Sequence, residues 1–273
     1  MTRNVLITGG NSGIGYEMAL ALAKQGDRVI IAARSESKSQ EAISKIKAAV
    51  PTAQVESLPM DLADFGNIDQ FAQTLLAKMP VIDVLILNAG LYTLKLGTLP
   101  NGYESMMGVM HFGHFRLARH LLDAVKAATQ GRIVVTSSMI HNLGKIDEAS
   151  FKNPSLHKTG LHAYGQAKLA NLLFTRDLAR RLKNTNVTVN AFHPGAVATD
   201  IYRQVPRFLQ PLIRLTMLTP AQGADTAVWL ATAPETGKIS GEYFISRKKK
   251  SGSKLSQDAD LAKKLWQLSE AAM

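Results

Sequence analysis

Short apolar segments alternate with helical segments along most of this chain, and this rhythm constrains the fold more than any other feature. Most apolar segments lack a polar–apolar alternation, as expected for strands covered on both faces. Strands that alternate with helices imply a parallel, doubly wound sheet flanked by helices, which makes this an α/β domain. The predicted strands are Val5–Ile7, Val29–Ala32, Gln54–Leu58, Val81–Leu87, Arg132–Val135 and Val187–Phe192, and the predicted helices are Gly13–Gln25, Ser39–Val50, Ile68–Lys78, Tyr103–Ala128 and Leu161–Lys183.

Two late segments depart from this rhythm. Asp200–Leu218 is rich in large apolar residues and contains Pro206 and Pro211. We expect it to be an irregular or helical flap over a bulky apolar substrate, although a helix packed on the core would have the same composition. Residues 256–273 are predicted to form a helical tail with an apolar stripe. We interpret residues 1–273 as a single domain.

The composition limits the chemistry and the partners. The chain has 273 residues, 46% of them hydrophobic, and no cysteine, which excludes disulfides and thiolate sites. Its seven histidines show no metal-ligand spacing, so no metal is predicted. The net charge of +11 comes from scattered residues without a nucleic-acid motif, so no nucleic-acid partner is predicted.

The cellular location of the protein can be predicted from its targeting, membrane-spanning and basic segments. No signal peptide and no apolar run of about 20 residues is recognised, which favours a cytoplasmic protein. The dense cluster Arg247–Lys250 is expected to be an exposed loop, and peripheral contact with anionic membrane lipid is the alternative.

A glycine-rich loop joins the first strand to the first helix. In a Rossmann-type fold this turn binds the pyrophosphate of a dinucleotide, because glycines allow close backbone approach and the helix N-terminus supplies N–H donors. A chance glycine cluster is the alternative, but its place between a strand and a helix favours the functional interpretation. The predicted cofactor-binding residues here are Thr8, Gly9, Asn11, Ser12, Gly13, Ile14 and Gly15.

The end of the second strand indicates which dinucleotide binds. An NAD site usually has a carboxylate there for the ribose 2′-hydroxyl. This chain has small residues followed by Arg34, which can grip a 2′-phosphate, with Lys38 to assist. Glu36 would oppose this if it pointed inward. NADP(H) is therefore the preferred cofactor, and NAD(H) is the alternative.

Further candidate residues follow the later strands, where strand ends meet the cofactor crevice. Asp61 can accept a hydrogen bond from an adenine amino group, or it can cap the next helix. Asn88, Ala89 and Gly90 follow the fourth strand and could equally form an ordinary turn. Together with their neighbours, the predicted cofactor contacts are Asp61, Leu62, Asn88, Ala89, Gly90, Pro194 and Gly195.

Tyr164 and Lys168 stand four residues apart in a predicted helix, so both fall on one face. A tyrosine hydroxyl titrates near pH ~10 and is a poor acid or base at neutral pH. A cation held beside it lowers that pKa. The pair therefore predicts general acid–base chemistry.

These motifs, in this order, resemble the short-chain dehydrogenase/reductase superfamily. The resemblance covers nearly the whole chain, and a narrower likeness is to the retinol-dehydrogenase-like branch, which includes WW-domain oxidoreductases. It implies a ketone, an aldehyde or a primary or secondary alcohol as substrate, and a homo-oligomer built through Tyr103–Ala128 and Leu161–Lys183; the predicted apolar flap favours a hydrophobic substrate. The shared marks are Thr8-Gly-x-x-x-Gly-x-Gly15, Asn88-Ala-Gly90, Ser137-Ser138, Tyr164-x-x-x-Lys168 and Pro194-Gly195, with His111-Phe-Gly-His-Phe115 for the branch.

The resemblance also assigns roles. Ser138 would hydrogen-bond the substrate oxygen and Tyr164 would donate or accept its proton. Lys168 would lower the tyrosine pKa, and Tyr164 and Lys168 would both contact the cofactor. The pattern breaks at Met110, where the family has an asparagine that holds a relay water. A thioether is a weak acceptor and no donor, so either the Met110 carbonyl holds the water or the relay is altered.

Three functions remain open on the sequence. The first is an NADP(H)-dependent carbonyl reductase or alcohol dehydrogenase. The second is a reductase of a C=C bond with the same fold, in which Tyr164 protonates carbon. The third is a cofactor-binding protein with weak or no catalysis, which Met110 keeps open.

Overall fold

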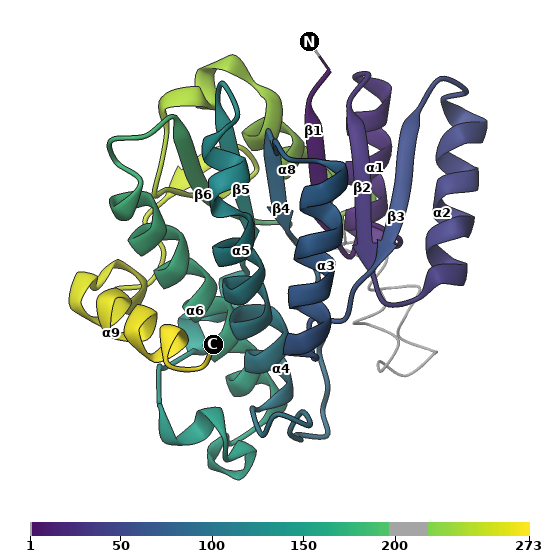
Figure 1. Cartoon of the computed structure of the whole chain (residues 1–273). Coiled ribbons are helices and arrows are strands. Elements are labelled where there is room, and N and C mark those ends of the chain that lie inside the picture. Colours follow the sequence, from purple (N-terminus) through teal and green to yellow (C-terminus); the bar gives the residue numbers. More distant parts are fainter. Residues whose placement is uncertain (1, 197–217) are drawn as a thin grey trace.

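A computed structural model describes residues 2–196 and 218–273. Its central eight-stranded sheet confirms the predicted doubly wound α/β fold (Figure 1). The strand order is β3-β2-β1-β4-β5-β6-β7-β8, parallel except that β8 pairs antiparallel with β7. Strand order reverses beside β1, which is where such sheets bind ligands. The strands are β1 (Asn4–Thr8), β2 (Arg28–Ala33), β3 (Gln54–Pro59), β4 (Val84–Leu87), β5 (Gly131–Thr136), β6 (Val187–His193), β7 (Tyr243–Ile245) and β8 (Lys248–Lys250).

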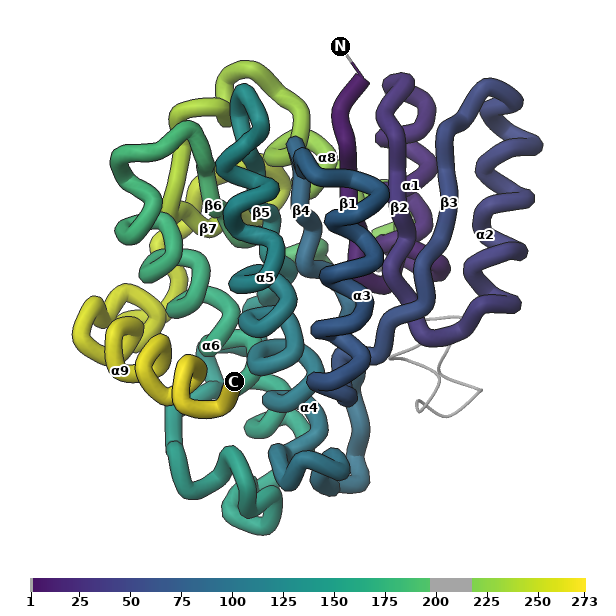
Figure 2. Tube along the Cα trace, viewed as in Figure 1, coloured from purple at the N-terminus to yellow at the C-terminus, as the bar shows by residue number. Residues whose placement is uncertain are grey.

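Helices cover both faces of the sheet, as Figures 1 and 2 show. Successive residues of β1 enter different cores: Leu6 packs on the side of α3, α5 and α6, and Val5 and Ile7 pack on the side of α1 and α8. Burial on both faces explains why the strands lack polar alternation. The longer helices are α1 (Gly13–Lys24), α2 (Glu36–Ala49), α3 (Phe65–Lys78), α5 (His114–Lys126), α6 (Gly160–Arg181), α8 (Pro220–Thr232) and α9 (Ala259–Glu270), and short 3₁₀ helices span Met139–Leu143, Ala149–Phe151, Pro154–Leu156, Pro234–Lys238 and Leu255–Gln257.

The helix predicted over Tyr103–Ala128 extends from Ser105 to Lys126, but its middle part is π-helical, which the sequence did not predict. A short α4 (Ser105–Met107) leads into a π-helix over Gly108–Gly113, and α5 follows. At Gly113 a Cβ would lie 2.5 Å from the Leu62 carbonyl oxygen, so glycine lets this wider turn press against the segment after β3. Such π-helical turns are rare in proteins, and those that occur often lie at functional sites.

The C-terminal part confirms one prediction and corrects another. The predicted helical tail is α9, and its Trp266 packs edge-on to Phe115 of α5 at 4.8 Å and parallel to Phe174 of α6 at 6.1 Å. Part of the face proposed for a subunit contact is therefore covered by the same chain. The flap predicted over Asp200–Leu218 lies, except for Leu218, outside the described residues.

The lysine cluster is an edge strand, not the expected loop. Ser246 and Arg247 have φ values of 49° and 57°, the signature of a type I′ turn, which returns Lys248–Lys250 along β7. Exposed lysines on an edge strand discourage pairing with another chain. Among the described helices, none has the length and apolar character needed to cross a membrane.

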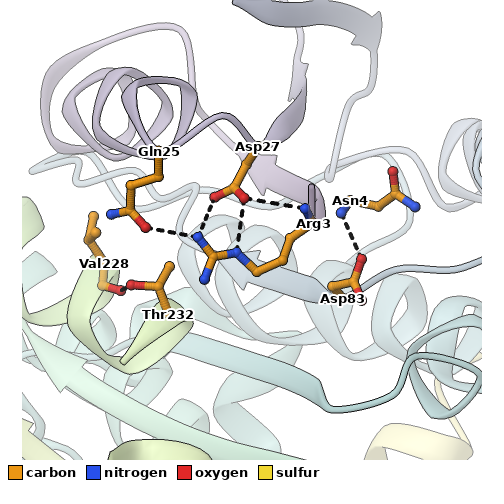
Figure 3. A network of polar contacts seen from close by, with 7 residues as sticks. All are labelled: Arg3, Asn4, Gln25, Asp27, Asp83, Val228 and Thr232. Carbon is orange, nitrogen blue, oxygen red and sulfur yellow. Dashed lines mark hydrogen bonds and ion pairs between the residues drawn. The ribbon is translucent and has the colours of Figure 1, made fainter. Parts of the chain in front are cut away.

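The amino ends of the central strands are tied together by a polar network (Figure 3). Arg3 grips the buried Asp27 with two hydrogen bonds of 2.9 Å, and the Asn4 N–H donates to Asp83 Oδ2 at 2.7 Å. Asp83 lies directly before β4, because this strand begins at Val84 and not at Val81 as predicted. The network leaves the opposite, carboxyl edge of the sheet to the binding site.

Candidate active site

A cavity of about 1160 Å³ opens at the carboxyl edge of the sheet. It collects the segments that follow β1 to β6, and every predicted site residue except Thr8 lines it. Its size suits a dinucleotide together with a small substrate. A second cavity, of about 710 Å³ near the amino end of β6, contains none of the predicted site residues.

The glycine loop brings backbone to the cavity wall. Gly9 has a φ of +67°, and a Cβ on Gly15 would lie 2.1 Å from the Gly9 carbonyl oxygen, so neither position accepts a side chain without rearrangement. Ser12 at the N-cap of α1 makes no side-chain cap, which leaves the first N–H groups of the helix available to a ligand. These features fit a pyrophosphate at the α1 N-terminus.

Thr8 supports this loop from behind and does not line the cavity. Its Oγ1 accepts hydrogen bonds of 2.9 Å from the N–H groups of Asn88 and Ala89. It also lies 2.9 Å from His114 Nε2, while His114 Nδ1 lies 3.0 Å from the Met110 carbonyl. A carbonyl only accepts, so Nδ1 donates to it and Thr8 donates to Nε2. Burial lowers the pKa of His114 to about 3, which keeps the ring neutral.

The residues predicted to select the cofactor lie at the mouth of the cavity. Arg34 and Lys38 are exposed and line it, whereas Glu36 is not among its lining residues. Asp61 also lines it, and its Oδ1 accepts from Ala63 N–H at 2.9 Å. The alternative role of Asp61 as a helix cap is wrong, since Asp64 caps α3.

Ser138, Tyr164 and Lys168 meet on the other wall of the cavity. Lys168 Nζ lies 5.4 Å from the centre of the Tyr164 ring and donates to the Thr136 carbonyl at 3.2 Å. Burial lowers the pKa of Lys168 to about 8, so the amine remains largely cationic at neutral pH. Ser138 Oγ accepts from Ile140 N–H at 3.2 Å, which leaves its own proton to donate.

Met110 faces the same point as the buried lysine. A Cβ placed on Gly90 would lie 3.2 Å from Met110 Sδ and 3.7 Å from Lys168 Nζ. The Met110 carbonyl, considered above as a holder of the relay water, already accepts from His114. The His111 side chain could also substitute for the missing amide, but its Nε2 lies 2.8 Å from Ser269 Oγ in α9.

Two further histidines lie on or behind this wall: His193 lines the cavity, and His141 lies behind Ser138. His141 Nδ1 donates to the Ser138 carbonyl at 2.6 Å, and its Nε2 accepts from Ser253 N–H at 2.9 Å. Neither ring nitrogen of His193 has a hydrogen-bond partner among the described residues. The His141–Ser253 contact spans 112 residues, so local sequence could not predict it. No group of three metal-binding side chains occurs in the described ranges.

The sequence and structure of this chain are similar to those of known proteins. The family model for short chain dehydrogenase matches residues 3–209. Retinol dehydrogenase 14 of Mus musculus is 37% identical, with 98% of this chain and 85% of that protein covered, and retinol dehydrogenase 13 of Homo sapiens is 35% identical, with 97% and 82% covered. The crystal structure of an uncharacterized protein from Mycobacterium paratuberculosis aligns with a TM-score of 0.80 and 32% identity over 99% of this chain and 92% of that one.

Proposed function

Because this chain belongs to the short-chain dehydrogenase family, whose retinol dehydrogenase members act on alcohols and carbonyls, we propose that it is an NADP(H)-dependent oxidoreductase for a hydrophobic carbonyl or alcohol. The observation that carries this proposal is one cavity with a phosphate-type glycine loop on one wall and Ser138, Tyr164 and Lys168 on the other. When bound, the nicotinamide supplies or accepts the hydride.

The three side chains divide the remaining work. Tyr164 gives a proton to the substrate oxygen during reduction and takes it back during oxidation. The Lys168 ammonium beside it stabilises the tyrosinate, which makes this transfer feasible near neutral pH. Ser138 donates its hydroxyl proton to the substrate oxygen and orients it.

Preference for NADP(H) is proposed from charge at the cavity mouth. Arg34 and Lys38 are exposed there and form no ion pair with another described residue. A 2′-phosphate would provide one, and a guanidinium binds phosphate in a bidentate manner. The glycine loop and the uncapped α1 accept the pyrophosphate of NADP(H) and NAD(H) alike.

A hydrophobic substrate is proposed from the composition of the outer cavity. Leu91, Leu94, Met139 and Leu161 line it beside Tyr92, whose ring packs edge-on to Tyr164 at 5.7 Å. An apolar substrate would bury these side chains, two of which are well exposed: Leu94 at 64% and Met139 at 50%. A cytoplasmic location, peripheral contact with anionic membrane and a homo-oligomer remain proposals, to be tested by fractionation, vesicle sedimentation and analytical ultracentrifugation.

Cofactor oxidation tests the proposal. Purified protein is mixed with NADPH or NADH and a panel of apolar aldehydes, ketones and enones, and cofactor absorbance is followed while products are identified. We expect NADPH-dependent formation of alcohols. Saturated ketones from the enones would support the C=C alternative, and tight NADPH binding without turnover on any substrate would support a cofactor-binding protein.

A further inference from the structure

Three buried histidines around the candidate site are held by hydrogen bonds to protein groups. His114 bridges the Met110 carbonyl and Thr8, and His141 bridges the Ser138 carbonyl and Ser253. The His111 Nε2 atom lies 2.8 Å from Ser269 Oγ. These contacts fix the rings and leave none of the three free to serve the reaction.

His193 differs from these histidines in its contacts. Only 7% of it is exposed, and both its Nδ1 and Nε2 are buried without a hydrogen-bond partner among the described residues. A buried polar group without a hydrogen bond is costly, so in folded proteins such groups usually bind water or a ligand. Since His193 also lines the cavity, a water molecule or a ligand in the cavity can reach its ring nitrogens.

The side of the sheet that His193 faces follows from strand alternation. Its neighbour Phe192 enters the core under α1 and α8, so His193 points toward α6, which carries Lys168. The titratable groups near it are His141 from the 3₁₀ helix after β5 and Lys168 from α6. Tyr243 of the neighbouring strand, two residues before the register partner Ile245, lies on the same face of the sheet and packs edge-on to His141. Burial, with smaller contributions from the nearby His141 and from the charge of Lys168, lowers the pKa of His193 to about 4, so its ring is neutral at physiological pH.

We propose that the neutral imidazole of His193 holds the water that returns a proton to Lys168, replacing the side-chain amide that Met110 does not provide. This inference rests on the proposed function. His193 is thus a positioning residue that acts through Lys168 and not on the substrate. A neutral imidazole offers one donor and one acceptor, which suffices to orient a water molecule.

The proton balance of reduction is simple. Tyr164 loses its hydroxyl proton to the substrate oxygen, and the Lys168 ammonium gives one proton to the tyrosinate. The held water gives a proton to the Lys168 amine and regains one from bulk water that enters through the open cavity. Only O–H and N–H bonds form and break, and the His193 ring stays neutral throughout.

Four variants test the proposal: His193→Phe, His193→Gln, Met110→Asn and the double variant His193→Phe with Met110→Asn. We expect His193→Phe to lower kcat on the order of tenfold and to raise the solvent isotope effect on kcat, because proton return becomes limiting. His193→Gln keeps a donor and an acceptor and should retain most of the rate. Met110→Asn should change the wild-type rate little but restore much of the rate in the His193→Phe background.

His157→Phe is the matched control, because His157 Nε2 is also buried without a described partner but His157 does not line the cavity. It should leave rate and isotope effect unchanged. A His193→Phe protein that unfolds at the wild-type temperature and keeps the wild-type rate would overturn the proposal. So would a loss that Met110→Asn cannot restore, or a loss equally large in His193→Gln.

A crystal structure of the wild-type protein separates this inference from the proposed function. We expect an ordered water within hydrogen-bonding distance of both His193 and Lys168 Nζ, whether or not a carbonyl substrate is found. If the protein reduces carbonyls but this water is absent, the inference fails and the function stands. If the water is present but no substrate turns over, the proposed function fails and the site geometry stands.

Discussion

The two walls of the cavity are built from different materials. The loop wall, residues 9–15, presents backbone, and its shape depends on glycines that leave no room for a Cβ. The lysine wall comprises Ser138, Tyr164 and Lys168, with His111, His114, His141 and His193 behind or beside them. Its side chains are polar or ionisable, and all of them are buried except Tyr164, which is partly buried. Changes in the loop wall should therefore alter cofactor binding without altering protonation. Changes in the lysine wall should alter the catalytic rate and also the way in which the free energy of unfolding depends on pH.

The largest difference should appear on replacing Tyr164 with phenylalanine. Tyr164→Phe keeps the ring packing against Tyr92 and removes only the proton donor. We expect kcat to fall about 10²–10⁴-fold while the dissociation constant of NADPH, measured by titration calorimetry, stays within about twofold. Tyr103→Phe, which removes a hydroxyl outside the cavity, is the control. Activity of Tyr164→Phe close to wild type would remove Tyr164 from the chemistry.

Acid should expose the energetic weakness of the lysine wall. His111 and His114 have pKa values of about 3 in the folded protein, lowered by burial, against about 6.5 when unfolded. The unfolded chain therefore binds more protons between pH 3 and 6.5, and stability falls as pH drops through this window. The two rings together predict a free energy of unfolding about 4 kcal/mol lower at pH 5 than at pH 7.

Urea unfolding at the two pH values measures this loss. His111→Gln should be less stable at pH 7 yet show a shallower decrease toward pH 5, since one proton-binding group is gone. His162→Gln, at the start of α6, should keep the wild-type slope. Equal stability of the wild-type protein at both pH values would contradict the burial of neutral rings.

Arg34 tests the loop side of the cavity. Arg34→Ala should weaken NADPH binding on the order of 10–100-fold, the equivalent of a charge-assisted hydrogen bond of about 1.5–3 kcal/mol, and leave NADH binding nearly unchanged. Arg28→Ala removes an arginine from the amino end of β2, the strand that Arg34 follows, where Arg28 pairs with Glu56 at 2.8 Å, and it serves as the control. Equal affinity of the wild-type protein for both cofactors would exclude the NADP(H) preference.

The smallest expected effect is a gain in stability. Burial lowers the Lys168 pKa from about 10.5 to about 8, so the folded state carries a penalty below pH 8 that is relieved as pH rises toward 10.5. Lys168→Met removes this penalty and also the bond to the Thr136 carbonyl, which keeps Asn171 Nδ2 as a donor at 3.1 Å. We expect a net stabilisation of about 1 kcal/mol at pH 7 by urea unfolding, and a smaller one at pH 10. A destabilised variant at pH 7 would mean that the amine supports the fold.

The two walls also differ in how far sequence could predict them. The loop wall is local: strand, glycines and helix follow one another, so Gly9 to Gly15 could be placed from spacing alone. The spacing of Tyr164 and Lys168 is equally local. The partners of the lysine wall come from distant parts of the chain, as Ser269 meets His111 and Ser253 meets His141. No periodicity encodes such contacts, and none encodes the π-helical turn at Met110 or the hairpin that makes Lys248–Lys250 a strand.

The network around Arg3 has a practical meaning for handling the protein on a surface. Arg3 and Asn4 hold the start of β1 at the amino edge of the sheet (Figure 3). The cavity opens at the opposite, carboxyl edge. A linker attached at the N-terminus would leave the molecule on the side away from the cavity, so an immobilised sensor or catalyst should keep its entrance toward the solution. Attachment at the C-terminus would instead load α9, the helix whose Ser269 contacts His111 behind the lysine wall.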